Sequence, residues 1–549
     1  MINNNINNNI NNFINNFINK INPASWRPDE RRRFLIALVS TGVCAWIAHG
    51  FIFANEFFSH DSIDFYTLGI HFYTQVGRFF IRFYEFLRGD LSIPWLIGFL
   101  FILWMSLTGY ILSRLFDLKS GRQIALICCL FTTNISITLT AATYIYCLDA
   151  YALALLCAVL AAYLFRNQNI FISSLGVIPL IFSLGLYQPY FTVTASLCLL
   201  DLFKNTASGE KILKIIQDGV KSLILLAASF IGYYALWMFF CRVFQMPPQR
   251  LDESLISQSD SLLSSLPSML YHTNRDYLRF LFHVKISQGL LLPVLNFIII
   301  ILILIRLISF LVNPKLPILN KIALVIFIIL MPTAFHSAYL LLSGGFNDLT
   351  AFANELFYLI PFLPVIPVKN PDKNPDKNLN HNPAKIPGNI NKNNIFSNFI
   401  SVFRGVAILC LALVIWQHMI FANQVYMKKA LEKNATLLLV GRILNQIESV
   451  EGYQPGETPI AFAGMVAQNW NINIAEEEFL EVQNWTGLYN SYSATYNMGS
   501  YLTRYLHYPI PLDRSRNYAE LPEVKAMPMY PAPDSIRMID GTVVIKLSD

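Results

Sequence analysis

The first long apolar run of the chain is FLIALVSTGVCAWIAHGFIF, residues 34–53, and it follows directly on three consecutive arginines, Arg31, Arg32 and Arg33. A helix of about 20 apolar residues crosses roughly 30 Å of hydrocarbon. Runs of this kind recur along the 549 residues, of which 54% are hydrophobic and 13% charged, whereas soluble domains carry about 25% charged residues. The chain is therefore not a soluble globule, and we predict an all-α polytopic membrane protein.

The apolar runs predict about eleven membrane-spanning helices. We expect them near residues 34–53, 93–115, 123–142, 150–165, 169–186, 190–204, 219–240, 289–311, 321–342, 352–367 and 399–421. With this numbering of crossings, the lysines and arginines of the short loops fall on one side, which the positive-inside rule makes cytoplasmic. The same bias explains the net charge of +6. The N-terminus is thus expected in the cytoplasm and the C-terminus outside.

Three regions differ from the transmembrane domain expected over residues 34–421. The Asn-rich residues 1–33 predict a disordered cytoplasmic tail, and the Pro- and Asn-rich stretch 368–398 predicts a low-complexity cytoplasmic loop. Residues 422–549 are polar and contain a helical pattern followed by the strand-like runs TPIAFAG and GTVVIKL. They predict a small external α+β domain.

The cysteines and histidines of the spans do not predict a metal site. The eight cysteines lie mostly within apolar runs and show no CxxC spacing, so they are interpreted as small buried hydrophobic residues. His49 and His336 also lie within spans, and neither has a second histidine at metal-binding spacing. We therefore expect no metal and no cofactor.

The external juxtamembrane loop, residues 54–92, contains the densest charge: SHDSIDFYTLGIHFYTQVGRFFIRFYEFLRGD, residues 59–90. Six polar residues in it are spaced by seven, four, three, four and three, which is helical periodicity: Asp64, His71, Gln75, Arg78, Arg82 and Glu85. Aromatic residues fill the other faces. This pattern predicts a helix lying in the membrane interface, which Gly69 and Gly77 could interrupt; a solvated juxtamembrane face is the alternative.

Acids and arginines in this loop suit group transfer at a lipid surface. A carboxylate can accept the proton of an attacking sugar hydroxyl as general base, and Asp61 is our first candidate. Asp64 competes for that role, and spacing does not choose between them; a surface acid at the end of a helix is the other interpretation of Asp61. A guanidinium can hold a phosphate and offset its developing charge, a role for Arg78 and also Arg82.

Two further external turns carry polar groups between spans. Asp149 stands among tyrosines in TYIYCLDAYALA, and Gln188 stands between Tyr187 and Tyr190 in GLYQPYF. Interfacial tyrosines are typical of the aromatic belt, whereas a carboxylate at that depth needs a reason. A sugar and acceptor pocket is predicted from these turns and the juxtamembrane loop: His60, His71, Gln75, Asp149, Tyr187 and Gln188.

An ordered series of short motifs resembles a known family. The series is HDS, VGRFF, LRGDLSIPWLIGFL, TYIYCLDAYALAL and SLGLYQPYF, and it is similar to the GtrII glucosyltransferases of bacterial membranes. The similarity runs from the first span to about Tyr190 and continues loosely after the last span. Family members commonly have two acids where this chain has His60-Asp61, which favours Asp61. The family's Gly-Arg is matched by Gly77-Arg78.

The resemblance implies a GT-C type fold with its active site on the external face of the bacterial plasma (inner) membrane. It implies a donor of the undecaprenyl-phosphate-sugar type, typically glucose, and transfer to a surface polysaccharide, with a catalytic Asp in the first external loop. A transporter or flippase for lipid-linked saccharides and a polysaccharide polymerase remain the alternatives. The partners expected are the lipid-linked donor, the polysaccharide acceptor and the bilayer, with no nucleic acid.

Overall fold

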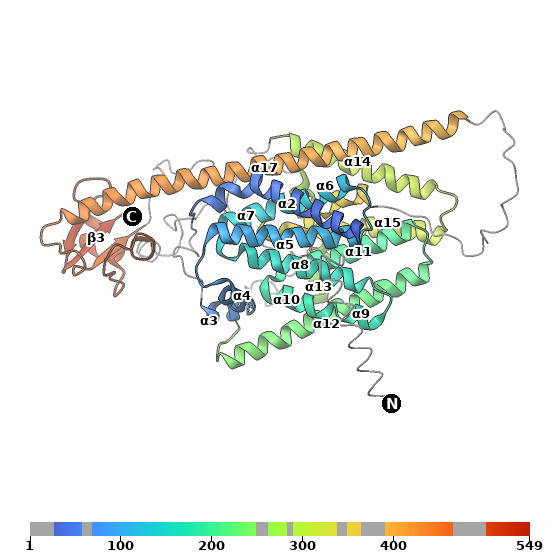
Figure 1. The fold of residues 1–549 in the computed structure, drawn as a ribbon. Helices are drawn as coiled ribbons and strands as arrows, with labels where there is room; N and C mark the ends of the chain where they lie inside the picture. Colours follow the sequence, from blue (N-terminus) through green and yellow to red (C-terminus); the bar gives the residue numbers. More distant parts are fainter. Residues whose placement is uncertain are drawn as a thin grey trace.

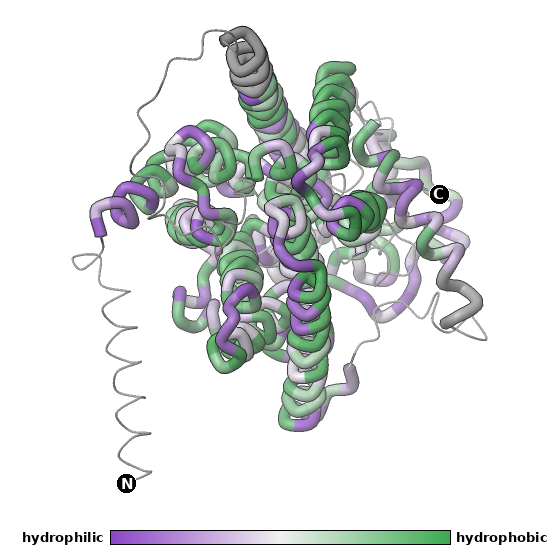
Figure 2. The backbone as a smooth tube through the Cα atoms, turned by 90° about the vertical axis from the view of Figure 1, so that its right-hand side faces the viewer, coloured by the Kyte–Doolittle hydropathy of each residue, from purple (hydrophilic) through white to green (hydrophobic). Residues whose placement is uncertain are grey.

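A computed structural model of the chain describes residues 27–57, 69–248, 262–282, 289–337, 348–363, 390–464 and 501–548. Its helices gather into one elongated bundle, along which a single long helix, α17, runs from end to end (Figure 1). Hydrophobic residues dominate the helices (Figure 2), and large ones are exposed on the outer surface, such as Trp46 at 66% and Ile329 at 67%. An apolar exterior of this kind suits a hydrocarbon environment.

The longer helices are α2 (Pro28–Ala54), α5 (Pro94–Leu115), α6 (Gly121–Thr133), α7 (Ile135–Thr143), α8 (Leu148–Phe165), α10 (Val177–Leu186), α11 (Phe191–Ala207), α12 (Ile212–Val243), α13 (Leu262–Phe282), α14 (Leu291–Val312), α15 (Ile318–Phe335) and α17 (Ile390–Glu448). Further helical segments lie between them: α3 (Ile70–Gln75), α4 (Ile81–Arg88), η2 (Ile145–Cys147), α9 (Ile170–Ser174), η3 (Gln188–Tyr190) and the longer η4 (Asp348–Phe362). The short helical segments η8 (Tyr501–Tyr505), η9 (Tyr518–Glu520) and α19 (Pro522–Ala526) follow in the C-terminal region.

Eight helical segments in the described part of the chain are long and apolar enough to cross a membrane. They are residues 28–54, 94–115, 121–143, 145–165, 212–243, 291–312, 318–335 and 402–448. The polytopic helical membrane protein predicted from the sequence is therefore confirmed. The other three predicted spans coincide with shorter helical segments, at 170–186, 191–207 and 348–362, so the count of eleven stays a prediction.

Several predicted boundaries differ from those of the structure. Helix α2 begins at Pro28, so residues 28–33 belong to the first helix and not to a tail; proline at a first helical position costs no hydrogen bond. Helix α17 begins at Ile390, inside the predicted loop 368–398, and it continues through the predicted domain boundary at 421/422. No proline interrupts residues 390–448, which explains the unbroken helix. Residues 1–26 and 364–389 lie outside the described residues.

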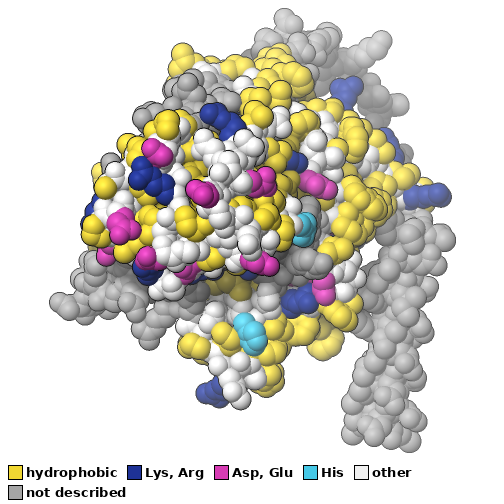
Figure 3. Space-filling view, turned by 90° about the vertical axis from the view of Figure 1, so that its left-hand side faces the viewer, with side chains coloured by type: hydrophobic (Ala, Val, Ile, Leu, Met, Phe, Trp, Pro, Cys, Tyr) yellow, Lys and Arg dark blue, Asp and Glu magenta, His cyan; other side chains and the backbone are white. Residues whose placement is uncertain are grey.

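The C-terminal region contains a small sheet of three strands, β1 (Ile460–Ala463), β2 (Ile536–Ile539) and β3 (Thr542–Lys546). Their order is β1-β3-β2, with β1 parallel and β2 antiparallel to β3. The runs TPIAFAG and GTVVIKL thus contain strands, as predicted. The end of α17 packs on this sheet through Leu439, Ile443 and Ile447. Figure 3 looks onto this end of the molecule and shows acidic and basic side chains scattered among hydrophobic and neutral ones.

The two ends of the bundle differ in character. Helices α3 and α4 lie toward the same end as the C-terminal sheet (Figure 1). At the opposite end, ion pairs join the loops and helix ends: Asp117 lies 2.8 Å from Arg166 and 2.7 Å from Lys204, and Arg114 lies 3.1 Å from Glu30. The basic loops predicted to be cytoplasmic thus contribute to a connected polar layer at that end.

Candidate active site at the α3–α4 end of the bundle

The polar stripe predicted as one helix is divided by a sharp turn at Gly77. Its φ is +76°, a conformation that residues with a Cβ rarely adopt. Helix α3 ends before this turn and α4 begins after it. The prediction of one continuous interfacial helix is therefore wrong, although Gly77 was one of the two expected points of interruption. The turn directs the stripe residues into different surroundings.

Hydrogen bonds hold this turn against the helix bundle. Tyr233 Oη donates to Gly77 O at 3.1 Å, and Gln188 Nε2 donates to Val76 O at 2.7 Å. Trp237 Nε1 donates to Thr74 O at 2.7 Å. Because α12 and η3 supply these donors, the backbone carbonyls of the turn are satisfied from two sides. Gln188, predicted in the sugar pocket, uses its amide nitrogen to hold the turn.

Arg78 follows the turn and lies against two stacked tyrosines. Its Nη1 donates to Tyr151 Oη at 2.7 Å, and its guanidinium carbon lies 5.7 Å from the Tyr151 ring centre and 5.4 Å from that of Tyr187. The two rings stack with their centres 4.1 Å apart. The buried Nε of Arg78 has no hydrogen-bond partner among the described residues. The guanidinium is thus fixed in position by aromatic faces, and one of its N–H donors is not used by the described residues.

A buried ion pair lies beside this cluster, between α4 and the start of α8. Arg88 Nη1 is 2.6 Å from Asp149 Oδ1 and also donates to Tyr146 O at 2.9 Å. Tyr84 Oη donates to the second carboxylate oxygen of Asp149 at 3.1 Å, and Trp104 Nε1 donates to Tyr84 Oη at 3.0 Å. Asp149, the carboxylate that the sequence marks as unusual within the membrane, therefore has Arg88 as its counterion. The sequence did not reveal this partner, although Arg88 lies in the LRGD motif.

Glu85 is a second carboxyl group in this region, and its side chain is buried. Tyr73 Oη donates to Glu85 Oε1 at 2.8 Å, while Oε2 has no partner among the described residues. Burial raises the pKa of Glu85 to about 7, the hydrogen bond from Tyr73 opposing that rise. A carboxyl group that titrates near neutral pH can exchange protons in either direction. The sequence placed Glu85 in the stripe but did not identify it as a site residue.

The remaining predicted residues have other surroundings. Arg82 pairs with Asp90 at the partly exposed surface of the loop. His71 is exposed and its ring lies nearly perpendicular to that of Phe244, and Gln75 is half-buried. Tyr187 donates its hydroxyl to Leu349 O at 3.1 Å, so it anchors η4 while its ring faces Arg78.

His60, Asp61 and Asp64 lie outside the described residues, which stop at Phe57 and resume at Gly69. The structure thus brings together Arg78, Asp149, Tyr187 and Gln188. To these it adds Tyr151, Arg88 and Glu85. Among the described residues, no group of three or more His, Cys, Asp or Glu side chains is placed to hold a metal ion.

These features define a polytopic membrane protein with a cluster of arginines, tyrosines and carboxyl groups at one end of its bundle. The family model "Glucosyl transferase GtrII" matches residues 50–368, more than half of the chain. The chain belongs to this glucosyltransferase family, which confirms the resemblance found in the sequence motifs. The matched region includes every residue of the cluster described above. Neither curated proteins nor solved structures give a match to this chain.

Proposed function

We propose that this membrane glycosyltransferase moves a glucosyl residue from a polyprenyl-phosphate donor of the undecaprenyl type to a surface polysaccharide on the external face of the membrane. The observation that carries the proposal is Arg78, whose guanidinium is held against Tyr151 and Tyr187 with one buried N–H left over. A cation in this setting suits a phosphate monoanion at the end of a lipid chain. Membership of the GtrII family supports the glucosyl group.

The transfer we propose inverts the anomeric centre. An acceptor hydroxyl attacks the anomeric carbon, the bond between that carbon and the phosphate oxygen breaks, and the polyprenyl phosphate leaves with the bonding electrons. Asp61 takes the proton of the hydroxyl, with Asp64 as the second candidate. Negative charge grows on the leaving phosphate, and Arg78 stabilises it there more than in the bound donor.

The neighbouring residues position Arg78. Arg88 and Tyr84 of α4 bind Asp149 of α8, and Gln188 and Tyr233 hold the turn that precedes Arg78. Asp149, Tyr187 and Gln188 remain candidates for shaping a sugar pocket. The proposed external location is supported by the arginine- and lysine-rich loops of the opposite end, which are typical of a cytoplasmic surface.

The test is transfer by the purified full-length protein in lipid vesicles. The donor is a defined glucosyl polyprenyl phosphate, the acceptor is isolated surface glycan, and the readout is the mass of the glycan. Arg78→Gln should reduce transfer at least 100-fold while the protein stays folded. Arg242→Gln is the matched control, because Arg242 is an exposed arginine at the end of α12, the helix on which α3 packs. Movement of the lipid-linked sugar from one leaflet of the vesicle membrane to the other, with no change in glycan mass, would overturn the proposal in favour of a transporter.

A further inference from the structure

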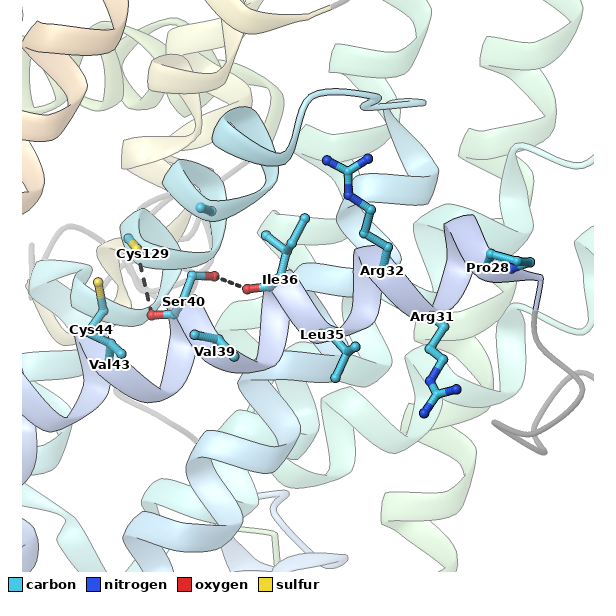
Figure 4. A pocket seen from close by; sticks show the side chains of 11 residues that line it. Pro28, Arg31, Arg32, Leu35, Ile36, Val39, Ser40, Val43, Cys44 and Cys129 are labelled. Carbon is cyan, nitrogen blue, oxygen red and sulfur yellow. Dashed lines mark hydrogen bonds between the residues drawn. The ribbon is translucent and has the colours of Figure 1, made fainter.

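A groove runs along the outer face of α2, remote from the candidate active site. Its volume is about 780 Å³, and α2 and α6 both contribute to its walls. Leu35, Val39 and Val43 line it at successive turns of α2, and each is about half exposed. Arg31 and Arg32 stand at one end of it, at the beginning of α2 (Figure 4). The groove is therefore apolar along its length and basic at its mouth.

The polar atoms in the apolar part of the groove are already satisfied. Ser40 Oγ donates to Ile36 O at 2.6 Å, and Cys129 Sγ donates to Ser40 O at 3.8 Å (Figure 4). These contacts stay within the walls, so this stretch offers a ligand dispersion contacts and burial of apolar surface rather than hydrogen bonds. A hydrocarbon chain fits that chemistry.

The two arginines at the mouth differ from their neighbours in α2. Among the described residues, neither the Arg31 side chain nor the Arg32 side chain makes an ion pair or a hydrogen bond, whereas Arg27 lies 3.8 Å from Glu30 and Arg33 Nη1 donates to Ser113 O at 3.3 Å. Figure 4 shows the side chains of Arg31 and Arg32 projecting to opposite sides of the helix. Two uncompensated guanidinium groups beside an apolar groove are complementary to a phosphate attached to an acyl chain.

We propose that this groove binds an anionic phospholipid of the surrounding bilayer. Its acyl chain lies along Leu35, Val39 and Val43, and its phosphate lies at the level of Arg31 and Arg32. Neither the family nor the proposed transfer reaction requires such a site, which lies at the opposite end of α2 from the candidate active site. The bound lipid would fix α2 against α6 at that end of the bundle.

A second groove in the structure provides an internal comparison. It has a volume of about 390 Å³ and lies between α9 and α12, lined by Ile216, Val220 and Ile224 beside Lys221. That lysine is already compensated, since its Nζ lies 3.3 Å from Asp218 and donates to Asn167 O at 2.9 Å. This groove should accept acyl chains without preference for the charge of the headgroup.

Native mass spectrometry of the full-length protein, released from detergent after titration with lipid, tests the proposal. Wild-type protein should retain phosphatidylglycerol in preference to phosphatidylcholine. The double substitution Arg31→Gln/Arg32→Gln should weaken phosphatidylglycerol retention about tenfold or more, and Arg27→Gln, which removes a paired arginine, should leave it within about twofold. Val39→Trp should also release the lipid by filling the groove, although both arginines remain.

Three results would overturn the proposal. The first is equal retention of phosphatidylglycerol by wild-type protein and the double variant. The second is an equal loss in Arg27→Gln, because general surface charge would then explain the binding. The third is displacement of phosphatidylglycerol from the wild type by an equimolar polyprenyl phosphate, together with loss of polyprenyl phosphate binding in Val39→Trp. The groove would then be a site for the donor lipid.

Discussion

The Nη1 atom of Arg88 lies 2.6 Å from Oδ1 of Asp149, and the two side chains are only 1% and 0% exposed. The pair joins a short helix at the end of the bundle to the first turn of a buried helix 61 residues further along the chain. It therefore ties the segment that carries Arg78 to the core. Removing either partner would leave a buried charge without compensation.

Asp149→Asn should destabilise the protein strongly, because Arg88 would keep its charge in a buried site. A buried pair broken on one side costs about 3–5 kcal/mol. A large fall in the apparent melting temperature of the detergent-purified protein, measured by aggregation or intrinsic fluorescence, should accompany loss of transfer. The double substitution Arg88→Met/Asp149→Leu should recover much of the melting temperature, since it removes both charges together.

The partly exposed pair of Arg82 and Asp90 is the matched comparison for that experiment. Asp90→Asn should lower the melting temperature far less than Asp149→Asn, because solvent screens the remaining charge. If Asp149→Asn and Asp90→Asn lowered the melting temperature equally, burial would not increase the cost of breaking the Arg88–Asp149 pair, and our argument would be wrong.

Gly77→Ala should disrupt the turn that precedes Arg78. Alanine at a φ of +76° costs about 1–2 kcal/mol, and its Cβ would collide with Tyr233 Oη and come within 2.8 Å of Gln188 Nε2. Both groups hold the turn, so transfer should fall at least tenfold as Arg78 shifts. Gly69→Ala is the control, since the φ of Gly69 is −67° and no atom of the described residues lies within 4 Å of the added Cβ. Normal activity in Gly77→Ala would show that this turn does not position Arg78.

Glu85 should make the stability of the protein depend on pH. Its pKa is raised from 4.5 to about 7 by burial, so the folded state binds the proton more tightly than the unfolded state. The contribution of Glu85 to the free energy of unfolding should be highest below pH 4.5, fall as the pH rises toward 7, and then level off. The fall attributable to this group is on the order of 3 kcal/mol.

The measurement is the melting temperature from pH 4.5 to 8 for wild-type protein and Glu85→Gln. The glutamine keeps an acceptor for Tyr73 but cannot ionise, so the difference between the two curves isolates Glu85 from all other groups. As the pH rises, the melting temperature of the wild type should fall relative to that of Glu85→Gln, because only the wild type loses the contribution of the protonated carboxyl group. Parallel curves would mean that the Glu85 carboxyl titrates outside this range.

The positions of the helices could be predicted from the sequence because a long apolar segment inside a lipid bilayer has few alternatives to the α-helix. A backbone in hydrocarbon must satisfy its own hydrogen bonds, and each of the eleven predicted spans overlaps a described helical segment. The first residues of α2 show what a hydropathy pattern cannot predict, which is how far a helix extends beyond the hydrocarbon. Hydropathy assigns residues 28–33 to a tail because five of the six are charged, but the helix extends into them, since water solvates charged side chains on a helix that leaves the hydrocarbon.

The partners of the site residues could not be predicted, because periodicity describes one helix at a time. The spacing of the stripe placed Arg78 and Glu85 on one face, but the turn at Gly77 depends on Tyr233, which lies 156 residues away. Likewise, Gln188 and Val76 are 112 residues apart in sequence. The sequence marks Asp149 as unusual for its depth, but only the packing of α4 on α8 identifies Arg88 as its counterion.

Arg78→Lys should separate charge from geometry in phosphate binding. A lysine keeps the positive charge but lacks the planar group that lies against Tyr151 and Tyr187 and offers several donors. We expect kcat/KM for the polyprenyl-phosphate donor to fall roughly 10- to 100-fold, with KM for the acceptor unchanged. The measurement is the initial rate of transfer at varied donor and acceptor concentrations. A rise in the acceptor KM alone would assign Arg78 to the acceptor side of the site.

Asp61→Asn and Asp64→Asn should identify the general base between the two acids of the juxtamembrane loop. A base contributes about 10²–10⁴-fold to a rate, so the variant of the true base should lose at least 100-fold in kcat while its KM for donor changes little. The other variant should keep activity within about threefold. The family motif favours Asp61, and its variant should therefore be the inactive one. Transfer must be measured above pH 6, where a carboxylate with an ordinary pKa is ionised. Full activity in Asp61→Asn with loss in Asp64→Asn would move the role to Asp64, and full activity in both would exclude a carboxylate base from this loop.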